Sequence, residues 1–271
     1  MYFVFNYFQL IKYILKCYVG FNPFKKIKGN FFKNDQKYIY FSCFLLIKII
    51  SLTFANKLQT AFNFSKRNKF YFKYNEEVKK FNFHPLSKFY KTAYYWEVIF
   101  TKFDLFGKKI NILEIGSFEG ESTCYFLRKF KNSITTCVDP WINTGLDGDY
   151  DFETIERNFD KNTYPFKEKL IKIKNFSDDY FQNKTYIKSI YDIIHIDGFH
   201  HFEQVYKDLN NCINLLNKNG ILIIDDFLLY NYFKDNYNEN PFGAAIVFLN
   251  KYKKKFKIIK ITNQLILKKY N

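Results

Sequence analysis

The sequence predicts an α/β protein with a mainly parallel β-sheet that is covered by helices on both faces. From about residue 91 onward, a helix around Trp96 is followed by short apolar runs that alternate with helical patterns and turn signals. Such runs are typical of strands buried on both faces, because the helices that connect parallel strands cover the sheet. A chain of 271 residues, of which 48% are hydrophobic, can bury one such domain together with an extension.

The most informative element is the strand predicted at residues 110–115, which breaks into a glycine turn. Gly116 lets the backbone bend sharply and come close to a ligand, and Gly120 opens the next helix, at 120–130, without a side chain in the way. Glu114 places a carboxylate at the end of the strand. The glycine spacing differs from that of dinucleotide sites, which disfavours an NAD-dependent reductase.

The next strand, predicted at residues 134–138, is rich in β-branched residues and ends at Asp139. An acid at the end of the second strand can accept hydrogen bonds from both hydroxyls of a ribose, since a carboxylate has acceptor sites for two donors at once. The alternative is an ordinary acid in a strand-end turn. Its spacing from Glu114 and Gly116 favours the role in ligand binding.

A helix at residues 151–161 and a strand at 169–174 follow in the alternating pattern. Ser177 and Asp178 come directly after that strand, at a place where an adenine ring could be hydrogen-bonded. Ser-Asp is also a common helix start, and the pair precedes a short helix expected at 178–185. Both interpretations stay open.

Two further strands, at residues 191–196 and 220–224, carry acids at their carboxyl ends. Asp197 follows the first strand, and Asp225 and Asp226 follow the second. If these strands are neighbours in a parallel sheet, the three carboxylates converge beside the glycine turn. Three oxygen ligands that face one cleft suit Mg²⁺, although these acids could also cap the next segment or face solvent.

The chain between and after these strands predicts the remaining elements. Apolar residues recur every three or four positions in a helix at 202–217, and Asn-Gly at 219–220 is interpreted as the stop of that helix. The tail predicts a helix at 241–252 and strands at 256–261 and 264–268, joined by a tight turn. This closing hairpin would add an antiparallel edge to the sheet.

Histidines near the acidic strand ends are candidates for proton transfer. His200 lies on the loop after Asp197, where an imidazole could take a proton from a hydroxyl acceptor, so it is the preferred general base. His201 could instead cap or pack. His195 lies within an apolar strand and is interpreted as a core histidine whose hydrogen bonds are satisfied.

The composition is strongly basic, with a formal net charge of +16, yet arginine makes up only three of the 42 basic residues. Proteins that bind nucleic acid more often use arginine for bidentate contacts, so the charge is discounted as a sign of nucleic-acid binding. The five cysteines form no C-x-x-C pair and no metal-finger spacing, which indicates free thiols in a reducing compartment. We therefore expect a cytoplasmic protein.

Residues 1–90 are aromatic and lysine-rich and are interpreted as a partly helical N-terminal extension that precedes a catalytic domain at 91–271. The stretch from Tyr38 to Ala55 is almost long enough to span a bilayer, but Lys48 interrupts it. It could equally be a hydrophobic helix that packs on the catalytic domain or lies at a membrane surface. The extension is thus a candidate for peripheral membrane association.

Several segments together resemble the class I S-adenosylmethionine (SAM)-dependent methyltransferases of the methyltransferase-24 type. They are LEIGSFEGEST, TTCVDPW, IKIKNFSDDYF, YDIIHIDGFHHFEQVYKDL, LLNKNGILIIDDF and PFGAAIVFLNKY, and they fall within about residues 91–270. The resemblance implies a Rossmann-like sheet of seven strands with a reversed final strand. It also implies that SAM is bound at the glycine turn and that a methyl group is transferred over the strand ends.

The resemblance implies roles for individual residues. Glu114, Gly116 and Gly120 would hold the methionine moiety of SAM, and Asp139 would hold the ribose. The other residues expected to bind the cofactor are Ser117, Ser122, Ser177 and Asp178.

The segments IDG and DDF are also similar to those of Mg²⁺-dependent sugar O-methyltransferases related to the macrocin enzymes. In those enzymes, acids at positions that match Asp197, Asp225 and Asp226 ligate the metal. They usually carry an acid two residues after the first aspartate, where this chain has Phe199.

The expected function is SAM-dependent O-methylation of a small-molecule or glycan acceptor, such as a sugar, assisted by Mg²⁺ that Asp197 helps to bind and by His200 as the base. The alternative is a catalytically inactive methyltransferase-like module whose basic face binds RNA or a membrane surface, because a fold alone does not establish an activity. The intact set of glycines and acids argues against this alternative.

Overall fold

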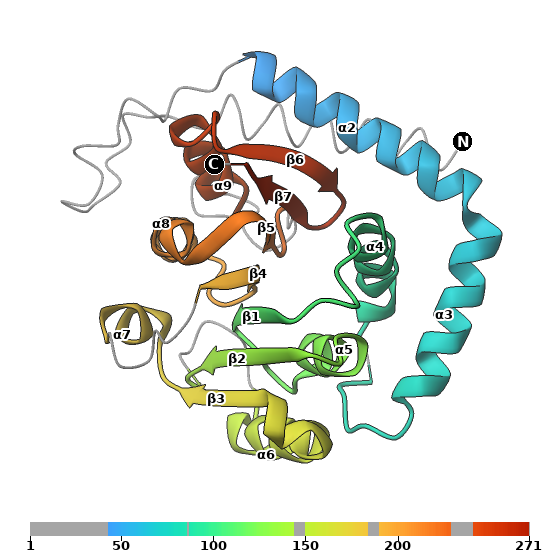
Figure 1. Cartoon of the computed structure of the whole chain (residues 1–271), viewed down its shortest axis with the longest axis vertical. Coiled ribbons are helices and arrows are strands. Elements are labelled where there is room, and N and C mark those ends of the chain that lie inside the picture. The colour runs from blue at the N-terminus through green and yellow to red at the C-terminus, as the bar shows by residue number, and fades with distance from the viewer. Residues whose placement is uncertain (1–42, 86, 144–149, 184–189, 229–240, 271) are drawn as a thin grey trace.

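In the computed structural model, residues 43–143, 150–183, 190–228 and 241–270 are described, with the exception of residue 86. They form a seven-stranded sheet in the order β3-β2-β1-β4-β5-β7-β6 (Figure 1). The first five strands pair in parallel, and β7 is antiparallel to both of its neighbours. The strands are β1 (Ile110–Ile115), β2 (Ser133–Asp139), β3 (Leu170–Lys174), β4 (Tyr191–Ile196), β5 (Leu216–Ile224), β6 (Phe256–Ile261) and β7 (Leu265–Lys269). The predicted fold class is confirmed.

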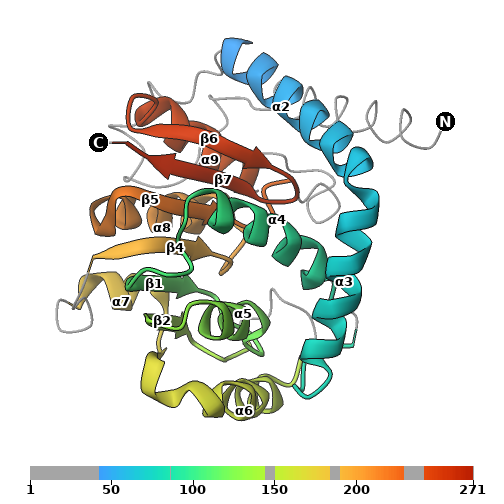
Figure 2. The same ribbon diagram turned by 45° about the vertical axis from the view of Figure 1, so that its right-hand side comes forward.

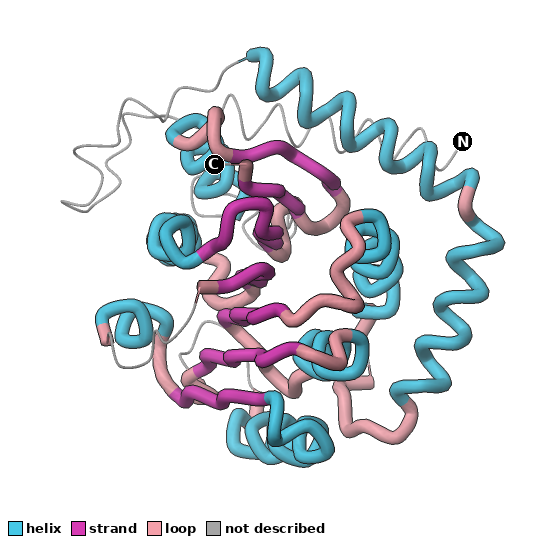
Figure 3. Tube along the Cα trace, in the orientation of Figure 1, coloured by secondary structure: helices cyan, strands magenta, loops and turns pink. Residues whose placement is uncertain are grey.

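Helices cover both faces of this sheet (Figures 1 and 3). One face carries α4 (Phe89–Lys102) and α5 (Glu121–Lys129), and the other carries α7 (Ser177–Gln182), α8 (Phe202–Leu215) and α9 (Pro241–Lys251). Successive side chains of a strand point to opposite faces, so Ile112 packs in the core beneath α4 and α5 whereas Leu113 packs in the core beneath α8 and α9. Helix α6 (Phe152–Thr163) and a 3₁₀ helix, η3 (Tyr164–Lys169), connect β2 to β3.

Two helices of the N-terminal extension lie on the outside of the domain (Figure 2). Helix α2 (Cys43–Phe62) packs against β6, and α3 (Phe64–Val78) packs against α4. The apolar stretch predicted at 38–55 falls in α2 from residue 43 onward, and its first residues lie outside the described part of the chain. None of the helices in the described part is both long and apolar enough to cross a bilayer.

One sequence-based boundary is wrong. Helix α8 ends at Leu215 and β5 begins at Leu216, so residues 219–220 lie inside a strand rather than at a helix stop. Asn219 has a positive φ of 65°, and the pairing of β5 with β4 shifts register across this segment. An Asn-Gly pair can adopt the backbone of a β-bulge as readily as that of a helix end, which is why the sequence pattern was ambiguous.

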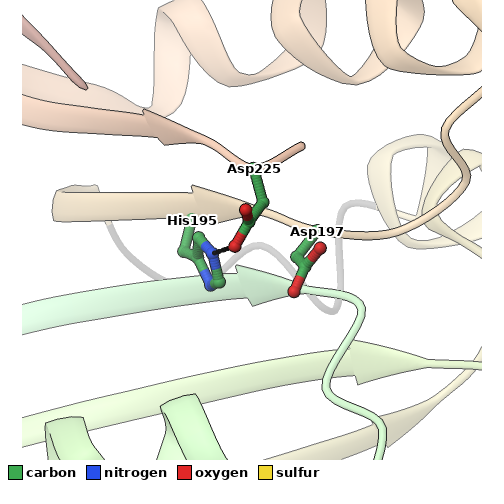
Figure 4. Close-up of side chains that lie close together, drawn as sticks. All are labelled: His195, Asp197 and Asp225. Atoms are coloured by element: carbon green, nitrogen blue, oxygen red, sulfur yellow. Dashed lines mark hydrogen bonds and ion pairs between the residues drawn. The ribbon is translucent and has the colours of Figure 1, made fainter. Parts of the chain in front are cut away.

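A chain of buried polar side chains runs across the middle of the sheet. Glu114 of β1 pairs in register with His195 of β4, and its Oε1 lies 3.0 Å from His195 Nδ1. His195 Nε2 lies 3.3 Å from Asp225 Oδ2, just beyond the end of β5 (Figure 4). Gln264 Nε2 donates to the same Asp225 oxygen at 2.6 Å, and Trp96 Nε1 donates to Gln264 Oε1 at 2.7 Å. These hydrogen bonds therefore link four strand ends to α4.

The charge on His195 offsets part of the negative charge of the two acids beside it. Burial acts to lower the pKa of His195, but its hydrogen bonds with Asp225 and Glu114 outweigh burial and raise the pKa to about 10. Burial acts to raise the pKa of Asp225, but the hydrogen bond with His195 holds it below its ordinary value. At neutral pH, His195 is therefore an imidazolium between two acids, and both of its ring nitrogens have partners, as expected of a core histidine.

The ends of β1 and β4 approach each other very closely at the glycine turn. The Asp197 amide donates to the Ile115 carbonyl at 2.8 Å, and the Gly116 amide donates to the Val138 carbonyl at 2.9 Å. A Cβ atom at position 116 would lie 2.1 Å from the carbonyl oxygen of Asp197, and the φ of Gly116 is +82°. Glycine is therefore required at this position by both contact and conformation.

We expect Gly116→Ala to lower the free energy of unfolding by at least about 2 kcal/mol, because alanine would clash with backbone and would have to adopt a left-handed conformation. Gly107→Ala is the matched control, since a Cβ atom at position 107 meets nothing within 4 Å. Urea unfolding of the two variants and the wild type measures the difference. Equal stability of the two variants would contradict the close approach of β1 and β4.

We expect His195→Gln to lower the free energy of unfolding by about 3 kcal/mol near pH 6, because two buried carboxylates lose their shared cation. The pKa of His195 is raised to about 10 from 6.5, so its stabilising contribution is complete below about pH 6.5 and is lost as the pH rises toward 10. The difference in unfolding free energy between wild type and variant should therefore shrink at high pH.

Urea unfolding at several pH values checks this expectation, with His201→Gln as a control outside the buried chain. A difference between wild type and His195→Gln that stays constant with pH would mean that His195 is uncharged.

Candidate active site

A cavity of about 960 Å³ lies at the carboxyl ends of the central strands, where ligands bind in open α/β sheets. The residues after β1, β2, β3 and β4 line most of it. Asp226, just after β5, and the segment between α3 and α4 complete the wall. The structure thus brings the sequence-predicted strand ends to one place.

Asp139 fixes the glycine turn from the neighbouring strand. Its Oδ2 accepts hydrogen bonds from the backbone amides of Ser117 at 2.8 Å and Phe118 at 3.0 Å, and its Oδ1 accepts from the Trp141 amide at 2.7 Å. Burial raises the pKa of Asp139, against the effect of these amides. Asp139 lines the cavity, but backbone donors already use three of its acceptor sites, which sequence reasoning had assigned to a ribose.

Glu114 differs from its sequence-based role, because it does not reach the cavity. Its side chain is fully buried, and the cavity wall does not include it. Oε2 accepts hydrogen bonds from the hydroxyls of Ser117 and Thr123, and Oε1 is held by His195. Glu114 therefore supports the turn from below instead of lining the cavity, and Ser117 connects it to the cavity wall.

The other predicted cofactor residues lie at or near the cavity. Gly120 begins α5 with a φ of +79°, and a Cβ atom there would lie 2.8 Å from the Phe159 ring, so Gly120 serves close packing rather than lining the cavity. Ser122, in the first turn of α5, lines the cavity. Ser177 and Asp178 also line it, and Gln204 Nε2 donates to both at 3.0 and 2.9 Å.

The acids beyond β4 and β5 gather in two groups that share Asp197. One ligand atom each from Asp197, His200 and Asp226 lie within 4.8 Å of one another, and the same holds for His195, Asp197 and Asp225. His200 Nε2 lies 3.2 Å from Asp226 Oδ2 and 3.5 Å from Asp197 Oδ1. The three aspartates expected to ligate a metal are therefore divided between the two groups.

Of the three aspartates, Asp225 is held in the buried hydrogen-bond network behind the site. Its Oδ2 is held by His195 and Gln264, and its Oδ1 accepts a hydrogen bond from the Asp226 amide at 2.7 Å. Asp226, with a φ of 48°, lines the cavity, whereas Asp225 does not. The sequence predicted that both acids ligate a metal, whereas only Asp226 of the two faces the cavity.

Burial, together with the charge of Asp225, shifts the pKa values of the cavity acids upward. Burial, followed by the charge of Asp225, raises the pKa of Asp197 to about 7. The same two causes raise the pKa of Asp226. Burial acts to lower the pKa of His200, but the interaction with Asp197 outweighs it and raises the pKa to about 9. Without a bound cation, His200 is thus protonated at neutral pH and neutralises part of this acidic cluster.

Sequence reasoning missed the part of the wall that the N-terminal extension supplies. Phe83, His84 and Ser87, between α3 and α4, line the cavity. The ring of His84 meets Tyr150 edge-on at 6.2 Å between centroids, and Tyr150 meets Phe118 at 5.5 Å. No motif marks this segment, so only tertiary packing reveals the role.

The segment is held in place by α5. Glu121 accepts hydrogen bonds from the hydroxyl of Ser87 and, at 3.1 Å, from that of Tyr74 in α3. Arg128 of α5 also forms an ion pair with Glu77 of α3 at 3.0 Å. The extension is therefore fastened to the helix that follows the glycine turn.

Residues 113–227 match the model of a family described as a methyltransferase domain. A curated relative, uncharacterized protein R132 of Acanthamoeba polyphaga mimivirus, is 31% identical over 128 residues, which are 45% of this chain and 53% of that protein. The chain thus spans about half the length of this relative.

Two solved structures have a similar fold. The O-methyltransferase TomG from Streptomyces achromogenes, solved with SAM, aligns with a TM-score of 0.52 and 11% identity over 74% of this chain and 89% of that one. The MycE methyltransferase of the mycinamycin pathway, solved with Mg and S-adenosylhomocysteine, aligns with a TM-score of 0.52 and 13% identity over 76% of this chain and 55% of that one. At such identities the likeness establishes the fold. The match of residues 113–227 to this methyltransferase-domain model confirms the resemblance to class I SAM-dependent methyltransferases seen in the motifs.

Proposed function

We propose that this protein transfers a methyl group from SAM to a hydroxyl group of a sugar or another small acceptor, with Mg²⁺ assisting. The observation that carries the proposal is the single cavity that joins the glycine turn and Asp139 to the cluster of Asp197, His200 and Asp226. A nucleoside-binding turn and a group of proton acceptors at one opening are what such a transfer needs.

The residues around the glycine turn suit a nucleoside cofactor. Ser117, Ser122, Ser177 and Asp178 bring polar atoms to the cavity wall. Ile142 and Phe176 are 43% and 40% exposed and line the same cavity, so they offer apolar surface to a planar base. Bound SAM supplies a methyl group that is already activated on a sulfonium, so these residues need only bind and orient it.

The donor set of the second half of the cavity fits a divalent cation. Asp197 and Asp226 provide carboxylate oxygens, which Mg²⁺ prefers, and His200 lies beside both. The ring nitrogens of His195 already have partners, which disfavours the other group as a metal site. A bound Mg²⁺ would lower the pKa of an acceptor hydroxyl at this place.

Proton removal falls to the same cluster. While no cation is bound, Asp197, with a pKa raised to about 7, can accept a proton near neutral pH; with Mg²⁺ bound it would serve as a ligand instead. His200 can do so only after its own proton is lost, since its pKa is raised to about 9. A cation held by Asp197 and Asp226 would favour that loss by repelling the imidazolium, which would convert His200 into a base.

We expect the wild-type protein to bind SAM or S-adenosylhomocysteine with a dissociation constant on the order of micromolar. Asp139→Asn should weaken binding at least about tenfold, because an amide cannot accept all three backbone hydrogen bonds that hold the turn. Isothermal titration calorimetry measures the affinities. A well-folded wild type that gives no binding heat with either ligand would defeat the proposal.

Asp192→Asn is the matched control for that experiment. Asp192 also accepts a hydrogen bond from a backbone amide, that of Asn111 at 2.9 Å, but it lies at the opposite end of β4 and outside the cavity wall. The affinity of the Asp192→Asn variant for SAM should equal that of the wild type. Turnover is then measured as S-adenosylhomocysteine released in the presence of a panel of sugars and other small hydroxyl compounds.

We expect Mg²⁺ to lower the pKa of His200 from about 9 by at least about one unit, because a cation on the neighbouring carboxylates repels the imidazolium. NMR titration of the histidine ring protons with and without Mg²⁺ measures this shift. Asp226→Asn should abolish the effect of Mg²⁺, whereas Asp178→Asn, elsewhere in the cavity wall, should leave it intact. If the pKa of His200 is the same with and without Mg²⁺, the metal is removed from the proposal. The part of the proposal that concerns SAM binding would still stand.

A further inference from the structure

Helix α2 exposes an apolar stripe along its outer side. The stripe residues lie three, seven, four and four positions apart, so they share one face, with the exposed Ser51 between Ile47 and Phe54. The stripe consists of Phe44 (77% exposed), Ile47 (62%), Phe54 (39%), Leu58 (36%) and Phe62 (86%). Large apolar side chains that gather on one surface in this way mark an interaction site more often than scattered ones do.

The opposite side of α2 is fastened to the domain. Ile49 is fully buried in the core, and the Asn56 side-chain amide donates to the Ile261 carbonyl of β6 at 2.9 Å. Lys260 Nζ donates to Gln59 Oε1 at 2.7 Å. Helix α2 lies along the outer edge of the molecule (Figure 2), and its exposed side carries the apolar stripe together with Lys48 and Ser51.

The charge around the stripe has one sign. Residues 43–75, which cover α2 and most of α3, contain no Asp or Glu, and the first acids after them are Glu76 and Glu77. The basic residues in this range are Lys48, Lys57, Lys66, Arg67, Lys69 and Lys73. Lys66 and Lys69 are exposed on α3 near Phe72, which is itself 72% exposed. The α2–α3 surface is thus apolar and cationic at once.

We propose that this α2–α3 surface binds the face of an anionic lipid bilayer, with α2 lying along the membrane plane. Phenylalanine and leucine side chains would enter the boundary between headgroups and acyl chains, while the lysines reach the anionic headgroups. Because the inner side of α2 is held by β6, only its outer side can enter the lipid. Apolar burial and attraction to negative lipid add to each other at such an interface.

Charge complementarity favours lipid over the two other candidate occupants. A second copy of the chain would bring the same lysines against one another without any acid to pair them. Residues 1–42 contain Asp35 as their single acid and several lysines, so they too lack the charge that this surface would attract. An anionic bilayer provides both the negative charge and the apolar medium.

Vesicle flotation with the full-length chain tests the proposal. Binding to phosphatidylcholine vesicles that contain about 30% phosphatidylglycerol should exceed binding to pure phosphatidylcholine at least about tenfold and should weaken with salt. The double variant Ile47→Asn/Phe54→Asn should lose about tenfold in binding to the anionic vesicles, and so should Lys66→Gln/Lys69→Gln. Tyr164→Ser is the matched control, since Tyr164 is 68% exposed on η3 but lies outside this surface, and its binding should equal that of the wild type.

Several outcomes would overturn the proposal. Equal binding to neutral and anionic vesicles, or no binding to either, would do so. Unchanged binding of both double variants would show that another surface contacts the lipid. A dimer in lipid-free solution that Ile47→Asn/Phe54→Asn dissociates would assign the stripe to a second copy. All of these variants change exposed residues, and retained affinity for S-adenosylhomocysteine or an unchanged unfolding midpoint shows that each one is folded.

Discussion

A single buried imidazolium holds together the strand ends on which the rest of the structure depends. Glu114 of β1 and Asp225, just after β5, lie on either side of β4. If His195 were neutral, the fully buried Glu114 carboxylate and the partly buried Asp225 carboxylate would lose their shared counter-charge. Breaking such a pair is costly because the remaining charge stays desolvated. The imidazolium therefore fixes the relative positions of β1, β4 and β5 at their carboxyl ends, where the cavity opens.

The same interaction separates residues that support the site from residues that face it. Asp225 is directed into the buried chain by His195 and Gln264, while its neighbour Asp226 turns toward the cavity with a left-handed backbone. Glu114 and Asp139 both hold the glycine turn, but through different groups of Ser117. One holds the Ser117 hydroxyl from below and the other holds the Ser117 amide from the side. Pre-organisation of the cavity wall thus comes from charged groups that have little freedom to move.

Much of the fold was readable from the sequence because its signals are local. The strands at 110–115, 191–196 and 256–261 begin and end at the predicted residues, since each is an apolar run with a clear break. The bulge at 219–220 was not readable, because Asn-Gly suits a helix end equally well. In the candidate site, the sequence placed the acids at the right strand ends. It could not show that Glu114 and Asp225 face inward, since this depends on His195, which is distant from both in sequence.

The extension was the least readable part, and packing explains why. Tyr74 of α3 is 2% exposed and lies in the same core as Trp96 and Phe126 of the sheet-covering helices. That core is completed by residues far apart in the chain, so no periodic pattern within the extension predicts it. The same packing fixes the segment after α3 against the cavity through Ser87 and Glu121. A helix pair that carries an exposed apolar stripe on one side is therefore continuous with a wall of the cavity on the other. Any partner that binds the stripe therefore contacts helices that pack directly on the domain that holds the site.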